Sequence, residues 1–315
     1  MPIDQFKALS TLVAIVCFMI LLCSGASASE SESNNGEVKL FEYIENEDFS
    51  SALNHLNSLY SAYPNGPEAE SQFMLEVDIA GDYLTPEQEQ LAEQFINLYP
   101  NHVSVKFLEA LYVSRKGTKA RGSKWSFDTA PKNFNNMKNE LYKSIPLFEA
   151  VLDEDPENHL AHVFTGVNYS FLNQKSRSNK HYKQALEISP ASYNAWTNIL
   201  WFNHPRWGGN YAVMEELLAE MESQVIANPR LTSLKGLVLT DKADRALRGK
   251  KLAESEELIF QALEFGVYGR NRKVLDSLHR EIQSSGDRAG ACRISTKVNA
   301  MYPDNLHYSD LADSC

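Results

Sequence analysis

The chain has 315 residues, of which 43% are hydrophobic, and it carries a formal net charge of −11. This length leaves room for one large domain, two domains or an array of repeats. An acidic chain without an extended basic cluster argues against nucleic acid as a partner and against electrostatic binding to anionic membranes.

The N-terminal residues have the order of a secretory signal peptide. A short polar start with Lys7 precedes the uncharged, mostly apolar run 8–23, and small residues at 24–28 precede the acidic stretch that begins at Ser29. The apolar run is shorter than the ~20 residues that a membrane-spanning helix needs. We therefore expect cleavage after Ala28.

Cleavage there would leave a polar linker at 29–36 and a helical domain at 37–315. The protein would then be periplasmic and have no membrane span. Two alternatives stay open. An uncleaved N-terminal helix could anchor the chain, because the weakly apolar stretch up to Ala28 could lengthen the span. Alternatively, the chain could be a lipoprotein that carries its lipid on Cys23.

Prolines punctuate the helical domain at the ends of amphipathic stretches. A proline cannot continue a helix, so each one marks where a helix ends or the next begins. The residues twelve, eight and five positions before several prolines lie on one helical face, and the first of them is small. These faces are Ala52, Leu56 and Leu59; Ser144, Phe148 and Val151; Ser178, Tyr182 and Ala185; and Ala291, Ser295 and Val298, which precede Pro64, Pro156, Pro190 and Pro303.

The step from Pro100 to Pro156 is too long for this series. It measures 56 residues, whereas the step before it is 36 and the step after it is 34. The excess falls around 116–135, which contains two glycines and several basic residues. Insertions in helical repeats map to loops, often on the binding face, so we expect a loop that carries Arg121 and Trp125. The alternative to an anion site here is a solvated loop.

The clearest unit runs from His159 to Pro190. Its first helix is predicted to carry Gly166 and Tyr169, and its second helix carries the face that precedes Pro190. This arrangement resembles the tetratricopeptide repeat, which has a small residue and an aromatic in helix A and a small–aromatic–small series in helix B. The 34-residue step matches the period of that repeat. The resemblance implies an all-α, tetratricopeptide-like solenoid of about seven antiparallel helix pairs; an irregular helical bundle is the alternative.

A second, five-residue excess coincides with 204–209, which contains the sequence Pro-Arg-Trp-Gly-Gly. This turn, together with the Arg-Gly-Ser sequence at 121–123, resembles a bacterial domain family of unknown function over roughly residues 105–230. The resemblance implies a bacterial origin and no specific activity.

The residues of this turn have two interpretations. Arg206 and Trp207 offer a planar donor group beside a stacking surface, which suits a carboxylate, a peptide terminus or a sugar if Trp125 lies nearby. Alternatively, Pro205 stops a helix, Trp207 fills a gap, and the glycines after it supply positive φ angles.

The C-terminal part continues the pattern less regularly. A degenerate unit without the proline is expected at 231–266, followed by a last helix pair at 275–303. After signal cleavage only Cys292 and Cys315 remain. An oxidising compartment favours a disulfide between them; unpaired thiols or a bond to another chain are the alternatives.

Motifs for chemistry are weak throughout the sequence. His159, His162 and His181 could face one point, but a metal site needs converging ligands with further support, and we expect no metal and no cofactor. We find no catalytic motif and expect no enzyme.

The function that we expect is a non-catalytic exported scaffold that binds an unknown protein or peptide. The alternative is recognition of a small ligand or glycan at the two insertions, through Arg121, Trp125, Arg206 and Trp207.

Overall fold

The computed structural model describes residues 39–80, 85–122, 126–266 and 269–302. These residues form α-helices and short 3-10 helices and contain no β-strand. They divide into two compact units, with the boundary between Phe202 and Asn203. Each unit is described here by itself.

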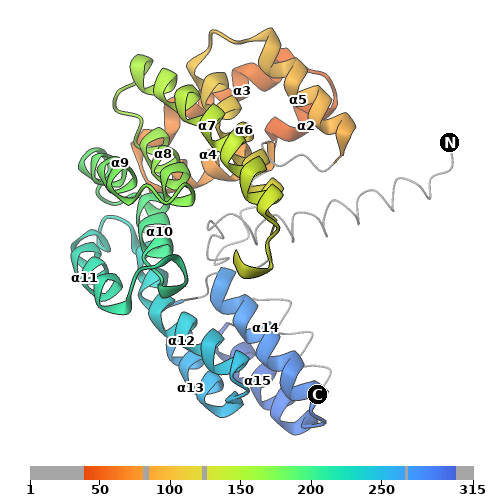
Figure 1. The fold of residues 1–315 in the computed structure, drawn as a ribbon, viewed down its shortest axis with the longest axis vertical. Helices are drawn as coiled ribbons and strands as arrows, with labels where there is room; N and C mark the ends of the chain where they lie inside the picture. The colour runs from red at the N-terminus through yellow and green to blue at the C-terminus, as the bar shows by residue number, and fades with distance from the viewer. Residues whose placement is uncertain (1–38, 81–84, 123–125, 267–268, 303–315) are drawn as a thin grey trace, which may run out of the picture. The chain divides into compact units, whose positions relative to one another are not determined.

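The first unit contains nine described α-helices in chain order (Figure 1). They are α2 (Lys39–Glu45), α3 (Phe49–Ala62), α4 (Pro67–Ala80), α5 (Pro86–Leu98), α6 (Val103–Arg121), α7 (Pro131–Glu154), α8 (His159–Phe171), α9 (Lys175–Ile188) and α10 (Tyr193–Phe202). Short 3-10 helices lie at η1 (Tyr63–Asn65) and η2 (Ser126–Asp128).

The second unit begins with the short helix η3 (Pro205–Trp207). The elements after it are α11 (Tyr211–Met221), η4 (Glu222–Gln224), η5 (Pro229–Gly236), α12 (Leu237–Arg248), α13 (Leu252–Leu263), α14 (Gly269–Ser284) and α15 (Arg288–Met301).

Consecutive helices pack as pairs within each unit. The pairs α2/α3, α6/α7 and α8/α9 pack in the first unit, and α12/α13 and α14/α15 pack in the second. The residues that the sequence placed on the helix-B faces are buried, apart from the half-buried Leu59. The predicted class, an all-α tetratricopeptide-like array of helix pairs, is therefore confirmed within the described units.

The pair α8/α9 shows why the repeat needs small residues. A Cβ atom on Gly166 would lie 2.8 Å from the Tyr182 ring, so only glycine lets the ring of α9 approach α8 this closely. The hydroxyl of Ser178 lies 2.6 Å from that of Ser170 on α8. Close packing and one partly buried hydrogen bond thus join the two helices.

A serine at the first position of the helix-B face has the same role in two other pairs. Ser144 of α7 donates to the carbonyl oxygen of Ala110 on α6 at 2.7 Å. Ser255 of α13 donates to the carbonyl oxygen of Ala243 on α12 at 3.0 Å. Both serines are buried, and a buried hydroxyl is stabilising only when it finds such a partner. The small residue therefore also supplies a helix-to-helix hydrogen bond.

The proline positions predict helix ends correctly. Helices α3, α5, α7 and α9 each end two residues before a proline, at Pro64, Pro100, Pro156 and Pro190. Pro229 instead begins η5, which shows the second role expected for these prolines, at the start of an element. The physical reason is the missing N–H and fixed φ of proline, which stop a helix but suit its first turn.

The loop predicted around 116–135 is wrong over most of that range. Helix α6 continues through Arg121, and α7 starts at Pro131 and runs beside α6 (Figure 1). Gly117 does not break α6; a Cβ there would lie 3.2 Å from the backbone oxygen of Met137 on α7. The extra residues therefore lengthen a helical hairpin, and Gly117 permits its close contact.

A buried carboxylate fixes the start of α10. Glu70 of α4 is only 4% exposed. It accepts hydrogen bonds from the Ser192 hydroxyl at 3.0 Å and from the backbone and side-chain nitrogens of Asn194 at 3.1 and 2.7 Å. His159 Nε2 lies 3.1 Å away. Burial by itself would raise the Glu70 pKa, but these contacts outweigh it and lower the pKa.

The second unit contains an apolar core cluster. Leu263, Leu278 and Ile294, from α13, α14 and α15, are among its buried residues. The degenerate repeat predicted at 231–266 is present, but its first helix begins as the 3-10 helix η5. Gly236 is the last residue of η5. A Cβ there would lie 2.6 Å from the Ala262 carbonyl oxygen, so glycine permits the close approach of this element to α13. Within the described ranges of the chain, no helix is long and apolar enough to span a bilayer.

Candidate functional site

The segment 204–209 is a compact turn held by its own backbone. The Trp207 and Gly209 nitrogens donate to the His204 carbonyl oxygen at 2.9 and 3.2 Å, and Gly208 N donates to Pro205 O at 3.1 Å. Gly208 has a φ of +78°, in the left-handed region that favours glycine. A Cβ on Gly209 would lie 2.0 Å from the Asn203 carbonyl oxygen. Gly208 is thus required for its backbone conformation, and Gly209 is required because a side chain would have no space.

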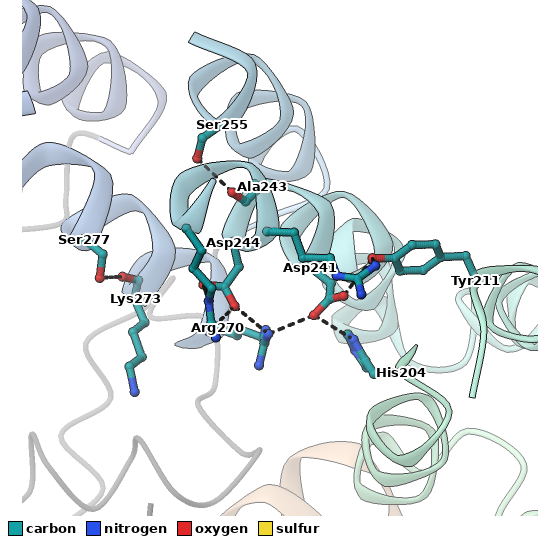
Figure 2. A network of polar contacts seen from close by, with 11 residues as sticks. His204, Tyr211, Asp241, Ala243, Asp244, Ser255, Arg270, Lys273 and Ser277 are labelled. Atoms are coloured by element: carbon teal, nitrogen blue, oxygen red, sulfur yellow. Dashed lines mark hydrogen bonds and ion pairs between the residues drawn. The ribbon is translucent and has the colours of Figure 1, made fainter. Parts of the chain in front are cut away.

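The turn is attached to α12 by a histidine–aspartate pair (Figure 2). His204 is fully buried, Asp241 is 4% exposed, and His204 Nδ1 lies 3.3 Å from Asp241 Oδ1. Burial lowers the His204 pKa even though Asp241 opposes this effect. The imidazole is therefore neutral at pH 7 and can place its Nδ1 proton toward the carboxylate.

Asp241 also receives groups from the neighbouring helices (Figure 2). The Tyr211 hydroxyl of α11 donates to Oδ2 at 2.8 Å, and Arg270 Nη2 of α14 donates to Oδ1 at 3.0 Å. Burial would raise the Asp241 pKa, but the contacts from His204, Tyr211 and Arg270 outweigh it and lower the pKa to about 2. Asp241, ionised at neutral pH, thus joins the turn, α11, α12 and α14.

Asp244 extends this network by one helical turn. It accepts from Arg270 Nη2 at 3.2 Å. It also accepts from Arg248 through Nε at 3.2 Å and Nη2 at 2.7 Å, the fork geometry typical of a guanidinium and a carboxylate. Arg245 Nη1 reaches the Tyr211 hydroxyl at 3.4 Å.

Four arginines surround the two aspartates, and we call them the arginine cluster: Arg206, Arg245, Arg248 and Arg270. Arg206, Arg245 and Arg248 are exposed, whereas Arg270 is half-buried. Arg206 lies within electrostatic range of Arg270, Arg248 and both aspartates. Three arginines of the cluster are thus exposed, whereas Asp241 is buried and Asp244 is half-buried.

Two of the four residues that the sequence proposed for ligand binding lie in this region. Arg206 and Trp207 are neighbours in η3, and the Arg206 guanidinium lies 5.7 Å from the centre of the Trp207 ring. Trp207 is half-buried, in agreement with a packing role for part of its ring.

The other two proposed residues belong to the first insertion. Arg121 ends α6, donates to the Gly122 carbonyl oxygen at 3.0 Å and lies over the Phe134 ring. Trp125 lies outside the described residues. The predicted convergence of the two insertions therefore stays a prediction.

Two basic residues of α6 near the first insertion, Arg115 and Lys116, are engaged in ion pairs. Arg115 pairs with the buried Asp78 of α4, and Lys116 lies 2.7 Å from Glu89 of α5. These contacts favour a structural role for this end of α6 over an anion site, because the positive charges are already neutralised by acidic neighbours.

The three histidines that were considered as metal ligands do not share one set of contacts. His159 contacts Glu70, whereas His162 Nδ1 lies 3.1 Å from His181 Nδ1. Among the described residues, no group of three or more histidine, cysteine, aspartate or glutamate side chains could hold a metal ion.

Only one of the two cysteines of the predicted disulfide lies within the described residues. Cys292 is half-buried in α15, and Cys315 lies outside the described residues. The bridge stays a prediction.

Sequence analysis missed the aspartates and most of the arginine cluster. The spacing Asp244 to Arg248 on one helix was an available signal, because residues four apart are neighbours on a helix face. Arg270 offered no such signal, since it reaches Asp241 from a different helix.

Comparison with known proteins gives a limited result. No family model matches the chain, and no curated protein matches it. Among solved structures, a tetratricopeptide repeat protein from Parabacteroides merdae is 13% identical, with 87% of this chain and 95% of that chain covered and a TM-score of 0.39. Yeast Tom70 is also 13% identical, with 98% and 71% covered and a TM-score of 0.35. Because both scores are low, the helix-pair architecture depends on the packing described above and not on these likenesses.

Proposed function

We propose that this chain is an exported, non-catalytic helical-repeat protein that binds a protein or peptide partner. The observation that carries the proposal is the repeated helix pair, in which a small residue of the second helix, such as Ser178 or the equivalent Ser255, is buried against the first helix. Stacked pairs of this kind bury one face and leave the other residues for recognition.

The titratable groups support a scaffold better than a reaction. Glu70 and Asp241 have lowered pKa values, and each is bonded to groups on other helices. His204 is fully buried beneath its turn. A catalytic acid or base must reach its substrate, whereas these side chains join structural elements.

Export is proposed from the signal-like order of residues 1–28. A periplasmic location would also favour the Cys292–Cys315 bridge. The Pro-Arg-Trp-Gly-Gly turn adds the proposal that residues ~105–230 belong to the bacterial domain family that they resemble. Cell fractionation with mass spectrometry of the N-terminus tests export: a chain that starts at Ser29 in the periplasm supports it. A chain that retains Met1 in a membrane fraction would instead support the anchor.

The binding function is tested by cross-linking and then by titration. The chain that begins at Ser29 is cross-linked in envelope extract, captured partners are purified, and their affinity is measured by calorimetry. A specific partner should bind with a dissociation constant in the micromolar range or tighter, and the heat-unfolded chain should not retain it. If every captured protein binds the unfolded chain equally well, the scaffold proposal is wrong.

Recognition of a small ligand or glycan is the second candidate. Its observation is the Arg206 guanidinium over the Trp207 ring, a planar donor group beside a stacking surface. Tryptophan fluorescence during titration with oligosaccharides tests it. Saturable binding that R206Q and R121Q both weaken would favour this candidate, and binding that only R206Q weakens would argue against a site shared by the two insertions.

A further inference from the structure

The three consecutive helices α8, α9 and α10 of the first unit are poor in acidic residues. From His159 to Phe202 the sequence contains one acidic residue, Glu187, although the whole chain has a net charge of −11. All the lysines and arginines of this stretch lie on α9, at Lys175, Arg177, Lys180 and Lys183. Four basic residues and one acidic residue give α9 a net charge of +3 within an acidic chain.

Two of these cations make no ion pair with the residues that the structure describes. Arg177 lies over the Tyr169 ring, with its guanidinium 5.5 Å from the ring centre, and has no carboxylate beside it. Lys180 is exposed and also has no carboxylate beside it. Lys183 lies 3.6 Å from Glu187, but these side chains are 78% and 62% exposed. Solvent screens such a pair, so it neutralises little of the positive charge.

The helices that pack against α9 do not supply the missing negative charge. Helix α9 packs against α8 and α10 (Figure 1), and neither of these helices contains an acidic residue. Glu70 of α4 is bonded at the starts of α8 and α10, but it is buried. The positive charge of α9 is therefore not compensated by its packing partners.

Arg177, Lys180 and Lys183 lie on the solvent side of α9, and we call them the basic face. All three are exposed, whereas the residues of the packed side, Ser178, Tyr182 and Ala185, are buried. Residues three apart are neighbours on a helix surface. With a rise of 1.5 Å per residue, the basic face extends over about 9 Å along the helix.

The basic face does not stabilise α9 itself. Acidic groups stabilise the N-terminal end of a helix and basic groups do not. The first turn of α9 contains no acidic residue and does contain Arg177, and the N-cap Gln174 makes no side-chain capping bond. Repulsion between neighbouring like charges opposes helix formation further. The stability of the helix therefore does not account for this arrangement of charge.

We propose that the basic face of α9 binds a short acidic segment of a partner protein, through the carboxylates of that segment. The inference rests on the proposed scaffold function and gives its partner a chemistry. The planar guanidinium of Arg177 matches a carboxylate in bidentate geometry, and Lys180 and Lys183 act as point charges. About 9 Å is the length of roughly three residues of an extended segment.

The size of the basic face favours a short segment over a nucleic acid or an anionic membrane. A duplex carries one negative charge per ~1.7 Å of its axis, and a bilayer presents charge over a whole plane. Either would extend well beyond the three cations and meet the acidic remainder of the chain. A short acidic segment places a few carboxylates on the basic face and ends there.

The test measures the anisotropy of fluorescein-labelled hexaglutamate during titration with the chain that begins at Ser29, at low and at physiological salt. The double variant R177Q/K180Q removes two charges from the basic face. Its control, K132Q/K138Q, removes two exposed charges of the same unit, on α7. The variant E187Q removes the carboxylate that competes for Lys183.

We expect R177Q/K180Q to weaken hexaglutamate binding about fivefold or more at low salt, because each exposed ion pair contributes up to about 1 kcal/mol. The control should stay within about twofold, and binding should fall as salt is added. E187Q should strengthen binding about twofold, a gain that misfolding would not produce. Circular dichroism should show all variants folded.

Four results would overturn the inference. A loss in the control equal to that in R177Q/K180Q would show that only overall charge matters, and weaker binding by E187Q would contradict its competition for Lys183. Equally tight binding of unlabelled hexaglutamine in competition would exclude carboxylate recognition. Sedimentation with phosphatidylglycerol vesicles that R177Q/K180Q abolishes, without binding of hexaglutamate, would assign the basic face to a membrane.

A partner identified by cross-linking separates this inference from the scaffold function. R177Q/K180Q should bind that partner more weakly than the control variant does. If R177Q/K180Q binds it with full affinity, the inference fails while the scaffold function stands.

Discussion

Replacing Asp241 with asparagine removes the charge that joins the turn 204–209 to α11, α12 and α14. The Asp241 pKa is lowered from 3.8 to about 2, and one pKa unit corresponds to ~1.4 kcal/mol. The ionised form therefore stabilises the folded second unit by about 2 kcal/mol relative to the protonated form. Because the folded pKa lies below the unfolded one, this stability is present above pH ~4 and is lost as the pH falls toward 2.

The assay is urea denaturation with pulsed hydrogen exchange, in which peptides from α12 report on the second unit by itself. We expect D241N to lower the free energy of unfolding by about 2 kcal/mol at pH 7, and the difference from wild type to shrink between pH 4 and pH 2. The control E264Q changes an exposed carboxylate to an amide in the same unit and should have little effect. A constant difference down to pH 2 would refute the reasoning, because it would show that asparagine disturbs packing and not charge.

Three further predictions concern other parts of the chain. Gly209→Ala should destabilise the second unit by about 2 kcal/mol or more, because its Cβ would overlap a backbone oxygen. The control Gly249→Ala has room for a Cβ and should not destabilise the unit. Thermal denaturation compares the two variants. Glu70→Gln should cost about 3 kcal/mol in urea denaturation at pH 7, and a loss below 1 kcal/mol would mean that the buried charge contributes little. Thiol labelling of the denatured, unreduced chain that begins at Ser29 should leave Cys292 and Cys315 unmodified; labelling of both would reject the bridge.

The fold was predictable where its causes are local. A proline stops a helix by its own geometry, so the positions of Pro64, Pro156 and Pro190 located helix ends without knowledge of the neighbours. The helix-B faces were visible for the same reason, since spacing along one helix decides which residues share a face. Gly117 misled the prediction because its effect is not local: it lies within α6 and gives α7 room to approach.

The candidate site was predictable only in part. The turn at 204–209 was conspicuous because proline, tryptophan and two glycines interrupt a regular spacing. Its attachment was hidden, since His204 meets Asp241 from 37 residues away and Arg270 comes from a third element. Sequence spacing identifies neighbours along a helix but not which of many acidic residues will be buried beside a distant base.

Glu70 and Asp241 suggest how an interrupted repeat stays ordered. In regular pairs such as α8/α9, small residues and apolar rings join the helices. On either side of the boundary between the two units, a buried carboxylate has this role instead: Glu70 holds the start of α10 within the first unit, and Asp241 holds the turn at His204 within the second.

Both of these carboxylates have lowered pKa values, so both contribute stability that disappears in acid. The apolar contacts of the helix pairs have no such dependence on pH. Acid should therefore loosen residues 192–211 before it separates the helix pairs. Hydrogen exchange measured between pH 7 and pH 2 tests this order directly. Protection should be lost first in peptides that cover 192–211, and earlier loss in α8 or α13 would contradict the distinction between contacts that depend on charge and apolar contacts.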